Sequence, residues 1–164
     1  TLANMPACLI SVLEGLKGES AIYAPFEDGG AQALTEAAEA LGAGLVDLAV
    51  VAAADSPDEP SSLAETAFWG HLRPAETASA ASAALVLARR GEGGYPPGQG
   101  LARLKLSRVQ AGEARDPLAA LIGRTMAAAP VILALLAATA PELRLPTEMV
   151  CSQGHRLSFE AVGP

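Results

Sequence analysis

The chain has 164 residues, of which 51% are hydrophobic, and its 11 lysines and arginines stand against 18 aspartates and glutamates. This length suits a single domain, and the hydrophobic fraction excludes disorder as the dominant state. The net charge of −7 argues against a nucleic-acid partner, because phosphate recognition needs clustered cations.

The first third of the chain predicts a helix, a strand, a second helix and a second strand. These elements span residues 5–16, 21–26, 31–43 and 45–53. The spacing of apolar residues by three and four marks the first helix and places Cys8 on its apolar face as a packing residue. The last of the four is a continuous apolar run, typical of a strand buried on both faces. A strand-helix-strand crossover of this length predicts a parallel pair and the α/β class.

The rest of the chain predicts two further helices and four strands. The helices span residues 117–129 and 131–140, and the strands span 80–89, 101–109, 149–151 and 156–162. Asp116 and Pro117 provide a cap and a first position for the earlier helix, and residues 101–109 alternate as in an outer strand. The apolar stretch 126–140 is shorter than the roughly 20 residues that cross a membrane, so we expect it to be buried.

The turn Glu27-Asp28-Gly29-Gly30 is the most informative place for chemistry. It joins a predicted strand to the start of a helix, where the helix dipole stabilises anions and nucleophiles. Two adjacent acids are also ordinary residues for a helix start, and on physical grounds this structural interpretation is favoured.

The remaining polar and aromatic residues point to no cofactor or metal. No pattern ties His71 or His155 to a nucleophile, and the two widely separated cysteines form neither a zinc motif nor a disulfide framework. Phe68 and Trp69 are expected to be core or interface anchors. We therefore expect no cofactor, no metal and a cytoplasmic protein.

The chain begins at Thr1 instead of methionine. We expect that an N-terminal part is missing or was removed. The alternative is that Thr1 is a nucleophile that uses its own amine as the base.

Several short runs resemble, in order, motifs of the β-ketoacyl synthases and their chain-length-factor relatives. They are Asn4-Met5-Pro6-Ala7, the turn 15–20, Gly30-Ala31-Gln32-Ala33, Gly44-Leu45-Val46-Asp47 and the predicted strand 80–89. The resemblance covers about residues 1–109, and Ser152-Gln153-Gly154-His155-Arg156 is loosely similar to the Gly-rich last strand of that family.

The resemblance implies half of a thiolase-like fold, with a mixed sheet flanked by helices, as one truncated domain over residues 1–164. It also implies that Glu27 occupies the position of the nucleophilic cysteine, so no catalytic residue is expected. The expected function is that of a non-catalytic, chain-length-factor-like subunit in polyketide, polyene or fatty acid biosynthesis. The alternatives are a malonyl-thioester decarboxylase and a degenerate scaffold domain.

The same resemblance implies the partners. We expect a heterodimer with a cysteine-bearing ketosynthase, or self-association, because a shortened fold leaves apolar surface uncovered. An acyl carrier protein would be an indirect partner. Neither nucleic acid nor a membrane is expected to bind.

Overall fold

The structure is a computed structural model, and it describes residues 5–23, 26–56, 64, 67–68, 77–89, 102–108, 116–146, 148–151 and 154–161. The helices are α1 (Met5–Leu13), α2 (Phe26–Gly42), α4 (Ala119–Ile122), α5 (Ala128–Thr139) and the 3₁₀ turn η1 (Pro141–Leu143). The strands are β1 (Leu48–Asp55), β2 (Ala81–Ala88), β3 (Ala102–Arg108), β4 (Glu148–Val150) and β5 (His155–Ala161).

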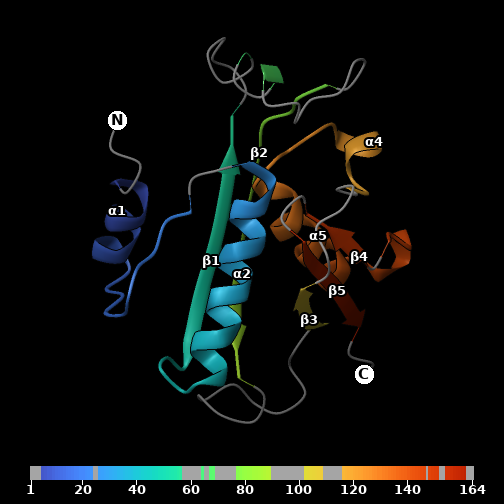
Figure 1. Ribbon diagram of the computed structural model, residues 1–164. Coiled ribbons are helices and arrows are strands. Elements are labelled where there is room, and N and C mark those ends of the chain that lie inside the picture. Colours follow the sequence, from blue (N-terminus) through green and yellow to red (C-terminus); the bar gives the residue numbers. More distant parts are fainter. Residues whose placement is uncertain are drawn as a thin grey trace.

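Helices α2 and α5 form a layer between two separate sheets (Figure 1). One sheet is the antiparallel pair β1–β2, with Val50 opposite Val86. The other has the order β3-β5-β4, and both of its pairings are antiparallel. Helix α5 packs against β1, β2, α2 and β5, so it lies at the centre of the core.

The core is built largely from small and branched aliphatic side chains. Its fully buried members include Ala31 and Leu34 of α2, Ala129 and Leu133 of α5, and Leu157 of β5. Alanines at these positions let the two helices approach each other closely. The chain is rich in alanine, and only 4% of its residues are aromatic.

The predicted fold class is corrected by this arrangement. The sequence predicted one mixed sheet flanked by helices, as in half of a thiolase-like fold. The described strands instead form two sheets whose ladders are all antiparallel, with the helices between them. The expected parallel pair is absent from the described part of the chain, because Ala21–Tyr23 forms no strand and α2 already begins at Phe26.

Most other elements lie where the sequence places them. The predicted strands 80–89, 101–109 and 156–162 correspond to β2, β3 and β5, and β3 is at the edge of its sheet as expected. Helix α2 ends at Gly42, and Gly44 follows with a φ of +71°, a backbone conformation that glycine adopts readily.

The predicted helix over residues 117–129 is broken. The side chain of Asp116 accepts a hydrogen bond from the Leu118 N–H at 2.9 Å, but the N-cap of α4 is Leu118, which has no side-chain cap, so Asp116 closes a local turn instead of capping the helix. Helix α4 is only four residues long, and Gly123 follows it with a φ of +80°. A Cβ at Gly123 would lie 2.3 Å from the Ser79 Oγ, so the chain turns here against the segment before β2.

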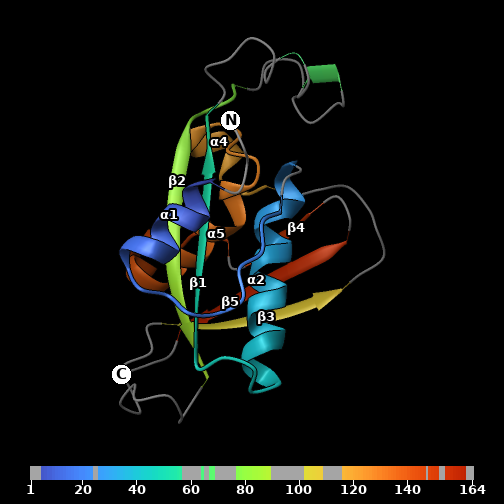
Figure 2. The same cartoon turned by 90° about the vertical axis from the view of Figure 1, so that its left-hand side faces the viewer.

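Apolar side chains are exposed on the side of the β1–β2 sheet that faces away from α5. They belong to the outward face of the sheet and to α1. Figure 2 shows α1 in front of this sheet. The outward-facing Leu48, Val50 and Val86 are 44–56% exposed, and Val12 and Leu13 of α1 are 78–79% exposed. Cys8 is also exposed, so its predicted packing role is wrong.

Candidate functional site at the N-terminal ends of α2 and α5

The first turns of α2 and α5 lie against each other at one end of the helix layer (Figure 1). The close approach depends on glycine, because a Cβ at Gly30 would lie 2.0 Å from the Ala127 carbonyl oxygen. A Cβ at Gly29 would lie 3.3 Å from the carbonyl oxygen of Tyr23, which is a tight but less severe contact. Two positive helix ends therefore meet in a buried region.

Asp28 and His155 form a buried pair at this place. Asp28 lies in the first turn of α2 and is 4% exposed, and His155 is the first residue of β5 and is 7% exposed. The His155 Nδ1 is 3.5 Å from the Asp28 Oδ1, which is an ion-pair distance and too long for a good hydrogen bond. Neither ring nitrogen of His155 has a hydrogen-bond partner among the described residues. The Asp28 carboxyl group therefore lies beside the ring without a directed hydrogen bond to it.

The backbone holds His155 in this position. The His155 carbonyl oxygen accepts a hydrogen bond from the Cys151 N–H at 2.9 Å, and the Cys151 carbonyl oxygen accepts one from the Gly154 N–H at 3.0 Å. Gly154 has a φ of +84°, which closes the turn between β4 and β5. The imidazole is therefore placed by a short hairpin and lies across from α2.

A second carboxylate, Asp55, caps α5 from the end of β1. The Asp55 Oδ2 accepts the N–H of Ala128, the first residue of the helix, at 2.6 Å. The neighbouring Ala127 has no side chain that could do this. Burial raises the pKa of the Asp55 carboxyl to about 6, and the Ala128 hydrogen bond opposes that rise. Asp55 is thus a partly buried helix cap whose carboxyl has a pKa of about 6.

The segment between α4 and α5 adds two more buried polar residues. Arg124 is 7% exposed, and its Nη1 lies 4.0 Å from the Asp116 Oδ2. The Arg124 backbone bonds to both Thr77 and Ser79, at 2.8 and 3.0 Å. Thr125 is fully buried, and its hydroxyl has no partner among the described residues.

The Asp28–His155 pair is buried and Asp55 is partly buried, so this polar cluster is suited to holding the fold. General acid–base chemistry needs a group within hydrogen-bonding reach of a substrate atom, and both ring nitrogens of His155 are buried. Asp28 lies in the first turn of α2, and Asp55 accepts the first N–H of α5, where the helix dipole offsets part of the cost of burying a carboxylate. The cluster therefore positions α2 and α5 relative to β1 and β5.

Only some of the site residues predicted from the sequence have side chains that the structure describes. Glu27 is the second residue of α2, but its side chain lies outside the described residues. Phe68 is 79% exposed, so it is not a core anchor. His71 and Trp69 lie outside the described residues.

Sequence reasoning missed three members of the cluster. They are Asp55, Arg124 and Thr125. The available signal was weak: Asp55 ends a long apolar run, and Arg124 is the one charged residue between Asp116 and Glu142. Neither pattern indicates the burial or the contacts, because the contacts join residues up to 73 positions apart.

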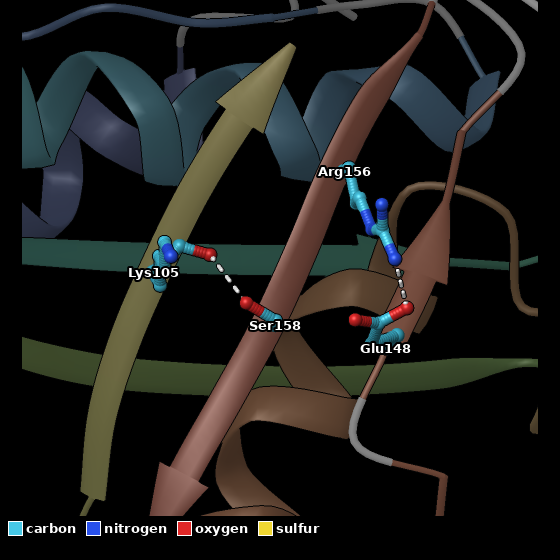
Figure 3. Close-up of polar contacts among 4 residues, drawn as sticks. All are labelled: Lys105, Glu148, Arg156 and Ser158. Carbon is cyan, nitrogen blue, oxygen red and sulfur yellow. Dashed lines mark hydrogen bonds and ion pairs between the residues drawn. The ribbon is translucent and has the colours of Figure 1, made fainter. Parts of the chain in front are cut away.

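The outward face of the three-stranded sheet is polar and has an ordinary structural role. In Figure 3, the Arg156 Nη2 lies 2.5 Å from the Glu148 Oε2, and the Ser158 hydroxyl donates to the Lys105 carbonyl oxygen at 3.5 Å. The Arg156 and Glu148 side chains are 42% and 50% exposed. Pairs of this kind contribute roughly 0–1 kcal/mol.

The described residues include neither a metal-ligand cluster nor a membrane-spanning helix. No group of three or more histidine, cysteine, aspartate or glutamate side chains among them is arranged to hold a metal ion. No helix in the described ranges has the length and apolar character needed to cross a membrane.

Comparison with known proteins gives a likeness of fold. No family model and no curated protein matches the chain. A chain in one solved complex matches 98% of the present chain with a TM-score of 0.72 and 16% sequence identity. That complex is described as AntDE:AntF (apo), a type II polyketide synthase acyl-carrier protein in complex with its ketosynthase bound to the hexaketide. The present chain spans 65% of the length of the matched chain.

These comparisons correct the family expected from the sequence. The description of the matched structure names an acyl-carrier protein in complex with its ketosynthase. No family model supports membership of the β-ketoacyl synthases or chain-length factors. A sequence identity of 16% shows a likeness of fold alone. The expected family and the expected thiolase-like half-fold are therefore wrong. The chain resembles in fold a chain of a type II polyketide synthase complex.

Proposed function

We propose that this chain is a non-catalytic component of a polyketide synthase complex. In that role it binds a partner ketosynthase, as a chain-length factor does, and helps to shape the pocket that holds the growing acyl chain. The observation that carries the proposal is the fold likeness over 98% of the chain to a member of such a complex. The proposal includes a cytoplasmic location and an acyl carrier protein as an indirect partner.

The polar cluster supports a non-catalytic role. Transfer or decarboxylation of an acyl thioester needs a nucleophile or base that the substrate can reach, together with donors aimed at the developing oxyanion. His155 is 7% exposed, and its Nδ1 lies 3.5 Å from the Oδ1 of the buried Asp28. This burial disfavours the malonyl-thioester decarboxylase that the sequence left open.

The uncovered apolar surface supports association with a partner. Large exposed apolar patches are rare on monomers and mark interaction sites. Here such residues occur on α1 and on the outward face of β1–β2. A degenerate scaffold domain would bury the same surface without altering any product.

The test is reconstitution with a purified type II ketosynthase and its malonyl-loaded acyl carrier protein. The expected result is a stoichiometric complex in native mass spectrometry and a change in the length distribution of the products. An unchanged distribution despite complex formation would favour the scaffold alternative. Release of carbon dioxide from malonyl carrier protein by the isolated chain would overturn the non-catalytic role.

Glu27 provides the matching test within the chain. A negative charge in the first turn of α2 is favoured by about 0.3–1 kcal/mol, so Glu27→Gln should cost little stability and leave the product pattern unchanged. Glu39→Gln, an exposed position on the same helix, is the control. Glu27→Cys should not gain condensing activity, because His155 is buried against Asp28. Acylation of that cysteine followed by condensation in the isolated chain would contradict the proposal.

A further inference from the structure

Helix α1 presents its apolar side to solvent. Val12 and Leu13 are 79% and 78% exposed. Within residues 7–20, only Ala7 and Ser11 are partly covered, and they lie one turn apart on the opposite side of the helix. Figure 2 shows α1 in front of the β1–β2 sheet. The side of α1 that the chain partly covers is therefore the side with small residues.

The exposed side of α1 carries apolar residues at helical spacing. Four of them stand at positions i, i+3, i+4 and i+7: Leu9, Val12, Leu13 and Leu16. Gly15, with a φ of +65°, ends the helix, and the Leu16 N–H donates to the Ser11 carbonyl oxygen at 2.9 Å, so Leu16 stays beside the last turn. This spacing is typical of an amphipathic helix that lies in a hydrophobic groove of another protein.

The length of α1 indicates that it needs such a contact. Isolated helices shorter than about 12–15 residues are marginal in water, and most helical stability in proteins comes from the packing of an apolar face. Helix α1 has only nine residues, and its apolar face is exposed. A partner that covers this face would therefore stabilise the helix as well as bind it.

The charges next to α1 favour a basic partner. Glu14 and Glu19 follow the helix and are exposed, and Lys17 is the one basic residue within residues 5–23. A second copy would set these carboxylates against another chain of net charge −7. Lysine or arginine at the rim of a groove would instead complement them.

We propose that α1 is the element that docks on the partner ketosynthase. Its four apolar residues enter an apolar groove of the partner, and lysine or arginine at the rim of that groove faces Glu14 and Glu19. This inference rests on the proposed function, because it takes the partner from there.

The first experiment measures the affinity of the full chain for a purified type II ketosynthase by titration calorimetry. Leu13→Gln keeps a good helix former but removes an apolar side chain, so it should weaken binding at least about tenfold. Leu143→Gln makes the same change in η1 at a leucine that is 55% exposed, and it should weaken binding less than about threefold. If Leu13→Gln binds as tightly as the wild type, or if both variants lose equally, this inference is overturned while the proposed function stands.

The second experiment tests the charges. The double variant Glu14→Lys with Glu19→Lys should weaken binding at least about threefold and make the association rate less dependent on salt. Glu39→Lys with Glu142→Lys changes the net charge equally at two other exposed positions, and it should change the affinity less than about twofold. An equal effect of the two double variants would overturn the basic rim.

Amide hydrogen exchange identifies the docked element. The N–H groups of residues 9–13 should exchange at least about tenfold more slowly in the complex than in the free chain, and unchanged exchange would overturn the inference. A dimer of the chain alone that Leu13→Gln dissociates would also overturn it, by showing that a second copy covers α1. The absence of any complex with the ketosynthase would overturn both the inference and the proposed function. A complex that forms through α1 but leaves the product lengths unchanged would overturn the pocket-shaping role alone.

Discussion

The contribution of Asp55 to the stability of this protein depends on pH in the opposite sense to that of most carboxyl groups. Its pKa is raised from 3.8 to about 6 in the folded chain because the carboxyl is partly buried. The folded state therefore binds a proton more tightly than the unfolded state. The contribution of Asp55 to stability is therefore fully present below the unfolded pKa of 3.8, and it is lost as the pH rises through about 6.

The size of this effect follows from the shift. About two pKa units, at about 1.4 kcal/mol each, set an upper limit of about 3 kcal/mol. Because Asp55 is only partly buried, screening by solvent reduces this to about 1–2 kcal/mol. Asp55→Asn removes the charge, while its amide oxygen can still accept the Ala128 N–H. We therefore expect the variant to be about 1–2 kcal/mol more stable than the wild type at pH 8, and no more stable at pH 4.

The assay is urea unfolding of the two proteins at several pH values between 4 and 8. The quantity of interest is the difference between their free energies of unfolding, which cancels the titration of other groups. Asp47→Asn, at the exposed position just before β1, is the control and should change stability by less than about 0.5 kcal/mol at every pH. A variant at Asp55 that is destabilised at pH 8, or a difference that does not change with pH, would refute the reasoning.

Two further predictions test the packing around α2. Gly30→Ala should destabilise the protein by at least about 1–3 kcal/mol in urea unfolding, because the new Cβ would clash with the Ala127 carbonyl oxygen. Gly42→Ala in the same helix meets nothing within 4 Å and should leave stability unchanged or slightly increased; equal losses at both glycines would contradict the close approach. The pKa of Tyr23 is raised to about 12 by desolvation and by its hydrogen bond to Glu36, so Glu36→Gln should lower it part of the way toward 10 in an ultraviolet titration, and an unmoved titration would exclude that bond.

The sequence by itself determined most of the local structure. Alanine, leucine and glutamate over residues 31–43 predicted the body of α2, and Gly42 and Gly44 predicted its end, because helix propensity and the left-handed conformation of glycine are local properties. The apolar runs that became β1 and β2 were also recognisable, since strand length and alternation are written in adjacent residues.

Only the tertiary structure decided how these elements pair and which polar residues meet. Residues 21–26 read as a strand, but a strand needs a neighbour, and Ala21–Tyr23 has none in the described part of the chain. The antiparallel partner of β1 lies beyond a long connection, and no local pattern specifies its direction. The pairing of Asp28 with His155 and the capping of α5 by Asp55 join residues that are 127 and 73 positions apart in the sequence, so only packing brings them together. For the same reason the sequence could indicate an apolar strand at β1, and the structure alone revealed that Leu48 and Val50 on its outward face are exposed.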